Sequence, residues 1–306
     1  MLEEIKEHAA FRAGVVAIVG HTNVGKSTLL NQLVGEKVTI VSDRVQTTRN
    51  VIRAILHEPR GQLVFLDTPG VHRAEGELGR FMNKSARAAV SGVDQILLVL
   101  DRSVPPTQID EGWFRRLAHE ACSPVFALNK SDVKPFYEAE YHTLWKQIAH
   151  EKEATAQPQW ISISARTGDG LDQLVDQLFL QVPEGPPLFS EEVLTDYPRK
   201  LNIADVVREK FVRRLHQELP HAVAVWVDHI HEKEERWQIE ASVLVERHSQ
   251  KGIVIGEKGR LIKRVKKEAQ EELSEMYQLK IALTLTVKVE KNWRKNYWIL
   301  KKLGYV

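Results

Sequence analysis

Short apolar runs alternate with longer amphipathic stretches from Arg12 to about Val182. The amphipathic stretches include residues 108–122 and 138–151, which have the character of surface helices. This alternation predicts an α/β domain with a mostly parallel sheet. The expected strands are Val15–Val19, Val51–His57, Leu63–Leu66, Gln95–Leu100, Val125–Leu128 and Trp160–Ile163.

One connection in this pattern is too short to hold a helix. The strands expected at 51–57 and 63–66 are separated only by residues 58–62. Because a parallel crossover needs about a dozen residues or more, this pair is predicted to form an antiparallel hairpin. The sheet is therefore expected to be mixed, with one antiparallel strand.

A proline-rich segment, VPEGPPL at 182–188, divides the chain. Three prolines and a glycine make a poor helix or central strand, so residues 183–198 are predicted to be an interdomain linker. The first domain is then 1–182, and 199–306 is an α+β domain that ends in a basic tail. Its expected elements are a helix at 200–219, strands at 221–230 and 237–245, a glycine turn at 256–259, a helix at 260–277 and a strand at 280–289.

Composition indicates the cellular compartment of the protein but not the reaction or the ligands. A length of 306 residues suggests about two domains, and a net charge of +2 says little about partners. The single cysteine, Cys122, rules out an intrachain disulfide framework and fits a reducing cytosol. No run has the length of a membrane span, and the charged N-terminus is unlike a secretory signal. A cytoplasmic protein is expected.

The segment GHTNVGKS, Gly20–Ser27, has the spacing of a phosphate-binding loop between a strand and a helix. Unpaired N–H groups at a helix N-terminus attract an anion, and glycines let the backbone curve closely around it. Lys26 supplies a charge near the β- and γ-phosphates, and Ser27 supplies a hydroxyl ligand for Mg²⁺. The residues expected to contact phosphate are Gly20, Asn23, Val24, Gly25, Lys26, Ser27 and Thr28.

The segment Asn129-Lys130-Ser131-Asp132 resembles the guanine-recognition motif of GTPases. The Asp132 carboxylate accepts from N1–H and the amino group of guanine, whereas adenine offers neither donor and leaves the acceptor unsatisfied. Asn129 is expected to tie this loop to the phosphate loop, and the Lys130 stem to cover one face of the base.

The segment Ser164-Ala165-Arg166 follows a later strand. It resembles the GTPase element whose backbone N–H meets guanine O6. Ser164 and Ala165 are therefore expected at the guanine site, which makes an ATP-dependent enzyme the least favoured alternative.

Asp67-Thr68-Pro69-Gly70 matches the DxxG motif of GTPases, which implies that Asp67 holds Mg²⁺ and that the Gly70 N–H senses the γ-phosphate. Thr47 and Thr48 both resemble the switch I threonine that contacts Mg²⁺ and the γ-phosphate. Val71 stands where Ras-like GTPases have a glutamine that orients water. Valine offers no side-chain hydrogen bond, so slow intrinsic turnover is expected.

GTPases with an apolar residue at that position include several in which an asparagine like Asn23 ligates K⁺. K⁺ would neutralise charge in the transition state. A side chain that only stabilises the loop is the alternative, and both are kept.

Residues 250–260 resemble the central signature of a KH domain, which clamps about four nucleotides beside a GXXG loop. The following helix is basic at its start, but acidic residues interleave after Lys267, where a solvated face is the alternative. The residues expected to contact RNA are Lys251, Gly252, Ile255, Gly256, Lys258, Gly259, Arg260 and Lys263.

A P-loop G domain, a short linker and a type II KH domain together resemble the Era family of bacterial GTPases, as do the stretches 46–49, 249–252 and 291–295. The resemblance implies a monomer that binds GTP, GDP, Mg²⁺ and the 3′ region of 16S ribosomal RNA, and that assists 30S subunit assembly. It also implies peripheral contact with the inner membrane. Two residues depart from the family pattern: Val45, where proline is usual, and Glu257, inside the GXXG loop.

The sequence therefore predicts a GTP-hydrolysing switch whose RNA affinity depends on the bound nucleotide. The alternative is a GTPase that regulates a protein or membrane partner through its C-terminal domain.

Overall fold

The computed structural model describes residues 10–41, 49–70, 76–120, 122–216 and 219–305. These residues divide into two compact units. The first contains residues up to 38, 51–71 and 86–196, and the second contains 39–50, 72–85 and 197–306. Two segments from the N-terminal half of the sequence therefore belong to the C-terminal unit.

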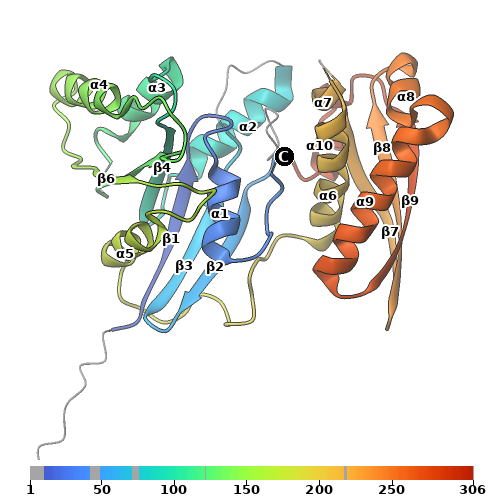
Figure 1. Ribbon diagram of the computed structural model, residues 1–306, viewed down its shortest axis with the longest axis horizontal. Coiled ribbons are helices and arrows are strands. Elements are labelled where there is room, and N and C mark those ends of the chain that lie inside the picture. Colours follow the sequence, from blue (N-terminus) through green and yellow to red (C-terminus); the bar gives the residue numbers. More distant parts are fainter. Residues whose placement is uncertain (1–9, 42–48, 71–75, 121, 217–218, 306) are drawn as a thin grey trace, which may run out of the picture. The chain divides into compact units, whose positions relative to one another are not determined.

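The first unit is built on a six-stranded sheet in the order β2-β3-β1-β4-β5-β6 (Figure 1). Strands β2 and β3 are antiparallel, and every other neighbouring pair is parallel, so the predicted mixed sheet with its hairpin is confirmed. The strand bounds are β1 Arg12–Val19, β2 Ile52–Glu58, β3 Gly61–Asp67, β4 Gln95–Asp101, β5 Val125–Asn129 and β6 Gln159–Ser162.

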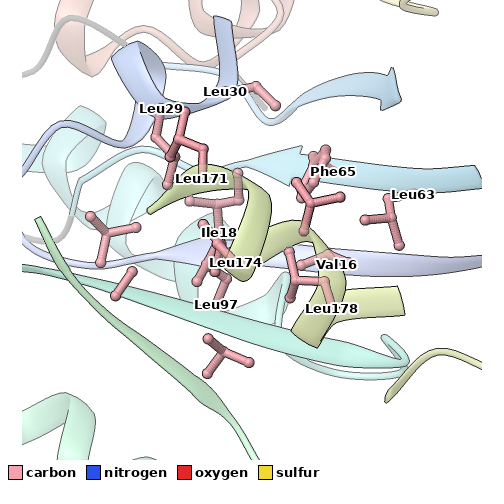
Figure 2. Close-up of a cluster of buried hydrophobic side chains, with 14 of the residues drawn as sticks. Val16, Ile18, Leu29, Leu30, Leu63, Phe65, Leu97, Leu171, Leu174 and Leu178 are labelled. Atoms are coloured by element: carbon pink, nitrogen blue, oxygen red, sulfur yellow. The ribbon is translucent and has the colours of Figure 1, made fainter. Parts of the chain in front are cut away.

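Helices cover both faces of this sheet. Helices α1 (Lys26–Val34) and α5 (Leu171–Gln181) pack on one face, where Ile18 of β1 lies beside Leu174 of α5 and Val16 lies beside Leu178 (Figure 2). The opposite face is covered by α3 (Gln108–Leu117), α4 (Glu138–Glu151) and Ala86 near the end of α2 (Gly76–Ala88). Apolar layers on both sides explain why these strands read as continuous apolar runs.

The amphipathic pattern predicts a helix at 108–122, but helix α3 ends earlier, at Leu117. The carbonyl oxygen of Ala118 accepts hydrogen bonds from the N–H groups of Thr155 (3.0 Å) and Ala156 (3.2 Å). A contact with residues far along the chain thus ends the helix, and Cys122 beyond it is only half-buried.

Residues of the proline-rich segment are attached to the first unit. The buried side chain of Gln62 accepts from the N–H groups of Leu188 (2.7 Å) and Phe189 (2.9 Å) and donates to the Phe189 carbonyl (2.8 Å). Ile55 of edge strand β2 donates its N–H to the carbonyl of Leu194. These contacts cover part of an edge that would otherwise expose unpaired backbone groups.

The second unit is an α+β fold, as predicted. Its sheet has the order β7-β8-β9, with β7 and β8 antiparallel and β8 and β9 parallel. Helices α6, α8 and α9 pack on one face of this sheet. The elements are α6 Arg199–Arg214, α7 Leu219–Ala222, β7 Ala224–Lys233, β8 Arg236–Val245, α8 His248–Ile255, α9 Arg260–Tyr277, β9 Lys280–Val289 and α10 Tyr297–Lys302.

Two sequence expectations in this unit are wrong in detail. The helix expected at 200–219 ends at Arg214, because Leu215 takes an extended conformation. His221 lies in α7 rather than in a strand, which begins only at Ala224. In the part of the chain that the structure describes, no helix combines the length and apolar character needed to cross a membrane.

Substituting Gly61 with alanine should destabilise the first unit. A Cβ there would lie 2.1 Å from the carbonyl oxygen of Arg12 and 2.7 Å from the ring of Phe179. Overpacking of this kind costs about 1–3 kcal/mol of the free energy of unfolding. Gly112 inside α3 is the matched control, since a Cβ added there would meet nothing. Alanine at this position should raise the free energy of unfolding by about 0.5–1 kcal/mol. Urea unfolding midpoints measure both, and equal midpoints would contradict the prediction.

Candidate functional site

Three loops of the first unit carry the motifs recognised in the sequence. The phosphate loop follows β1, Asp67 ends β3, and Asn129 ends β5. Because β1, β3 and β5 are parallel to the strands between them, these ends lie at one edge of the sheet. That edge is where open α/β sheets bind ligands.

The phosphate loop packs directly against Asn129. Gly25 has φ of 100°, and a Cβ on it would lie 2.3 Å from Asn129 Nδ2. The same Nδ2 donates to the carbonyl of Val24 (2.7 Å), and Asn129 Oδ1 accepts from the N–H of Ala165 (2.9 Å). One buried carboxamide therefore joins the phosphate loop to the segment at 164–166, and glycine at 25 permits the close approach.

Lys26 begins helix α1 and its side chain is buried. Its Nζ donates to the carbonyl oxygens of Gly20 (3.1 Å) and His21 (2.7 Å). Burial lowers the pKa of Lys26 to about 8, although the nearby charge of Asp67 acts in the opposite direction. The ammonium group is thus held by neutral acceptors, which a phosphate oxygen can replace with a stronger charge-assisted bond.

Ser27 and Asp67 provide the two oxygen donors expected for Mg²⁺. Ser27 Oγ donates to Asp67 Oδ2 at 2.9 Å, and Asp67 is fully buried. A hydroxyl and a carboxylate are hard oxygen ligands, and Mg²⁺ bound beside phosphates uses few protein ligands of this kind. The donor set therefore fits Mg²⁺. Gly70 lies against Thr22 of the phosphate loop, because a Cβ on it would be 2.7 Å from Thr22 Cγ2.

The Asp132 carboxyl is held in its ionised form, which accepts hydrogen bonds. Its Oδ1 accepts from Ser164 Oγ (2.6 Å) and its Oδ2 pairs with Arg166 (2.6 Å). The Ser164 hydrogen bond first, and then the charge of Arg166, lower the pKa of this carboxyl below its ordinary value. Lys130 adopts φ of 67° and pairs with Asp101 at the end of β4. The pairing of Lys130 with Asp101 was not anticipated, although the position of Asp101 directly after an apolar run was a usable signal.

The remaining predicted nucleotide residues are placed only in part. Thr47, Thr48 and Val71 lie outside the described residues. Asn23 is exposed with φ of 62°, a left-handed conformation that asparagine tolerates better than most residues. This conformation supports the loop-stabilising interpretation without weakening the K⁺ one. Thr28 is half-buried in the first turn of α1.

In the second unit, a GXXG loop separates α8 from α9. Gly256 has φ of 74°, and a Cβ on it would lie 2.7 Å from Leu261 Cβ and 2.9 Å from Leu261 N. Lys258 and Gly259 also have positive φ, at 49° and 75°. The chain therefore reverses tightly, and α9 presents its N-terminus at Arg260.

The charged side chains around this loop differ in whether they form ion pairs. Lys258 and Lys263 are exposed, and neither forms an ion pair with an acidic side chain among the described residues. Glu257 lies 3.7 Å from Arg260, so part of its charge is offset locally. Glu268 pairs with Arg214 at the end of α6 and with Arg264 within α9, so its charge is used inside this unit.

The apolar neighbours of the loop were only partly anticipated. Ile255 and Lys251 are half-buried and Gly252 is exposed. Ile253 is 52% exposed, and sequence reasoning missed it. An aliphatic side chain in a helix ahead of a GXXG turn was the available signal, because it offers a base an apolar contact.

A G domain with these nucleotide-binding motifs, followed by an α+β unit that contains a GXXG loop, defines a GTPase that carries a KH module. Residues 15–130 match the family described as "50S ribosome-binding GTPase", and residues 218–294 match the family described as "KH domain". The chain is 42% identical to GTPase Era of Geobacter sp. (strain M21) over 96% of this chain and 98% of that protein. It is 40% identical to GTPase Era of Leuconostoc citreum, over 97% of each chain.

Solved structures agree with these relatives. Era in complex with MgGDPNP and nucleotides 1506–1542 of 16S ribosomal RNA is 33% identical, with a TM-score of 0.88 over 97% of this chain and 99% of that one. An Aquifex aeolicus Era variant bound to GDP and AlF4⁻ is 33% identical, with a TM-score of 0.87 over 97% and 100%. The chain belongs to the Era family of GTPases, and the predicted fold class is confirmed.

GTP binding is expected to take up protons at alkaline pH. The negative charges of a bound triphosphate raise the pKa of Lys26 from about 8. Below pH 8 Lys26 is already charged, so affinity is flat, whereas above pH 8 binding must protonate it and affinity falls as pH rises. Calorimetry in buffers of different ionisation enthalpy should give about half a proton or more per GTP near pH 8.5 and almost none at pH 7.

The Lys26→Arg variant is the control for this linkage. Arginine stays charged throughout this pH range, so its proton uptake near pH 8.5 should vanish while GTP still binds. Uptake that persists in the variant would assign the proton to another group.

Proposed function

We propose that this chain is a GTP-hydrolysing switch that binds the 3′ region of 16S ribosomal RNA and assists assembly of the 30S subunit. The observation that carries the proposal is its full-length likeness to Era bound to MgGDPNP and that RNA. The Gly256–Gly259 loop, with the exposed Lys258 in it and the exposed Lys263 in the following helix, provides the matching feature in this chain.

The residues proposed to bind the nucleotide are the predicted ones. The phosphate loop and Lys26 bind the phosphates, Ser27 and Asp67 hold Mg²⁺, and Asp132 selects guanine. Bound Mg²⁺ would neutralise charge on the β- and γ-phosphates. The Gly70 N–H and one of the two switch I threonines are proposed to sense the γ-phosphate.

Slow intrinsic turnover is part of the proposal. Val71 offers the attacking water neither a donor nor an acceptor. K⁺ held by Asn23 is proposed to supply part of the missing stabilisation, because charge that develops on the phosphates in the transition state is stabilised by fixed cations.

The cellular setting of the switch is also part of the proposal. We propose a cytoplasmic monomer, with peripheral contact at the inner membrane. Control of a protein or membrane partner through the C-terminal unit is the competing function, and RNA binding separates the two.

Binding to a single-stranded RNA with the 3′ sequence of 16S rRNA should depend on salt through Lys258 and Lys263. Removing one lysine–phosphate interaction should reduce the slope of log affinity against log salt by about 0.7. Lys258→Gln and Lys263→Gln are expected to show this reduction, whereas Lys267→Gln is the control because Lys267 pairs with Glu271 (3.7 Å) further along α9. Absence of RNA binding even at low salt would favour the competing function.

GTP turnover should be faster in KCl than in NaCl. Asn23→Gly removes the amide oxygen but keeps the positive φ that position 23 requires. The variant is therefore expected to hydrolyse GTP at the same low rate in both salts while its GDP affinity stays close to that of the parent. Equal rates for the parent protein in the two salts would remove K⁺ from the proposal.

A further inference from the structure

The two faces of the sheet in the second unit are covered differently. Helices α6, α8 and α9 pack on the face that carries Val225 and Val243. Because side chains alternate along a strand, Ala224 and Leu244 point to the opposite face, where they pack against Leu300 of α10. We call this opposite face the outer face. The GXXG loop joins α8 to α9 and therefore belongs to the other side of the sheet.

Trp226 and Asp228 of β7 form a fixed pair on the outer face. Trp226 Nε1 donates to Asp228 Oδ1 (2.7 Å), and Ser242 Oγ donates to Asp228 Oδ2 (2.5 Å). The ladder of β7 and β8 shifts register between Val227 and His229, and a bulge of this kind re-aims the side chain that it contains. The carboxylate thereby holds the indole ring in one orientation.

Three lysines approach this pair. Lys302 Nζ lies 3.6 Å from the ring centre of Trp226, and Lys288 Nζ lies 5.9 Å from it. Lys288 Nζ is also 3.8 Å from Asp228 Oδ1, and Lys200 Nζ donates to the Asp228 carbonyl oxygen (3.4 Å). Three ammonium groups beside one carboxylate leave a surplus of positive charge that a further anion can use.

A hydroxyl group lies in the same part of the outer face. The strand register places Thr286 of edge strand β9 in the same row as Trp226. Thr286, Lys288 and Lys302 are all exposed. The next row of this face holds Glu240, which limits the cationic area on that side. Ammonium groups beside a hydroxyl are donors that the oxygens of a phosphate accept from.

Helix α10 adds an exposed aromatic ring to these cations. Trp298 is 73% exposed, and Lys301 Nζ lies 5.9 Å from its ring centre. Trp298 and Lys302 are four positions apart in the helix, so they lie on the same side of it. Single-stranded nucleic acid is bound by this combination, because bases stack on aromatic rings while cations contact the phosphates.

An anionic lipid surface is the alternative ligand of the same charge. Interfacial helices bind lipid through a broad apolar face that inserts below the headgroups. Helix α10 has only six residues, and its Ile299 and Leu300 pack inside the unit. RNA therefore fits this surface better than a membrane does.

We propose that Lys288, Lys302 and Trp298 form a second RNA contact, on the outer face of the sheet. The two lysines contact phosphates, and Trp298 stacks on a base of a single-stranded segment. A KH groove holds only about four nucleotides, so a longer RNA has further nucleotides with which to reach this face. This inference rests on the proposed function, in which the chain binds RNA.

The test measures the affinity of the full chain for an RNA with the 3′ sequence of 16S rRNA over a range of salt concentrations. Lys288→Gln and Lys302→Gln should each reduce the slope of log affinity against log salt by about 0.7. Trp298→Ala should instead lower affinity by about fivefold or more with the slope unchanged, because stacking releases no counterions. All three side chains are exposed, so the variants are expected to fold.

Lys280→Gln is the matched control. Lys280 is an exposed lysine of the same strand and the same face, but its position eight residues before Lys288 places it about 26 Å away along β9. Its loss should leave the slope and the affinity unchanged. Lys302→Arg should keep the parent slope, because arginine retains the positive charge.

The outcomes separate this inference from the proposed function. A slope that falls in Lys258→Gln but keeps its parent value in both Lys288→Gln and Lys302→Gln overturns the second contact and leaves RNA binding intact. An equal fall in Lys280→Gln also overturns it. Unchanged RNA binding in Lys302→Gln, together with loss of binding to phosphatidylglycerol vesicles, would assign the face to a membrane and overturn the inference. Absence of RNA binding by the parent chain overturns both.

Discussion

The nucleotide site depends on a single buried carboxamide. Asn129 donates to the Val24 carbonyl and accepts from the Ala165 N–H, so it fixes the separation of the loops after β1, β5 and β6. A net hydrogen bond contributes about 1 kcal/mol, but a buried partner left unsatisfied costs about 1–3 kcal/mol. Loss of Asn129 would leave two such partners. The absence of a Cβ at Gly25 belongs to the same constraint, because any side chain there would occupy the position of Asn129 Nδ2.

Local features of the sequence predicted much of this structure. The hairpin of β2 and β3, the bounds of α4, α9 and β9, and the loops that carry the three nucleotide motifs all depend on residues close together in the chain. Features that depend on distant residues were not predicted. The end of α3 at Leu117 is set by Thr155 and Ala156, and the course of 188–194 is set by Gln62 and Ile55. The burial of Arg49 depends on residues more than 170 positions away, and no periodic pattern records it.

The burial of charged residues in α6 was likewise not predicted from the sequence. Asp205, Arg208, Glu209 and Lys210 suggest a solvated helix, yet all four are buried. Lys210 pairs with Glu272 of α9, so this acidic residue serves packing against α6, whereas Glu271 and Glu275 are exposed. Lys210 is buried, so losing its acidic partner would leave an uncompensated charge, and the pair thereby ties α6 to α9. The basic residues at the start of α9 and in the GXXG loop are thereby left to define the charge that this end of the unit presents.

Arg49 differs from these pairs because no carboxylate of the described residues forms an ion pair with it. Burial lowers the pKa of its guanidinium, but arginine remains charged at neutral pH. Removing such a cation from water costs several kcal/mol. Hydrogen bonds to a charged group return about 1.5–3 kcal/mol each, and a desolvated ring face returns about 2 kcal/mol. The carbonyls of Val223 and His221, Tyr305 Oη and the ring faces of Trp293 and Tyr305 together offset that cost, so Arg49 is held in place without a carboxylate partner among the described residues.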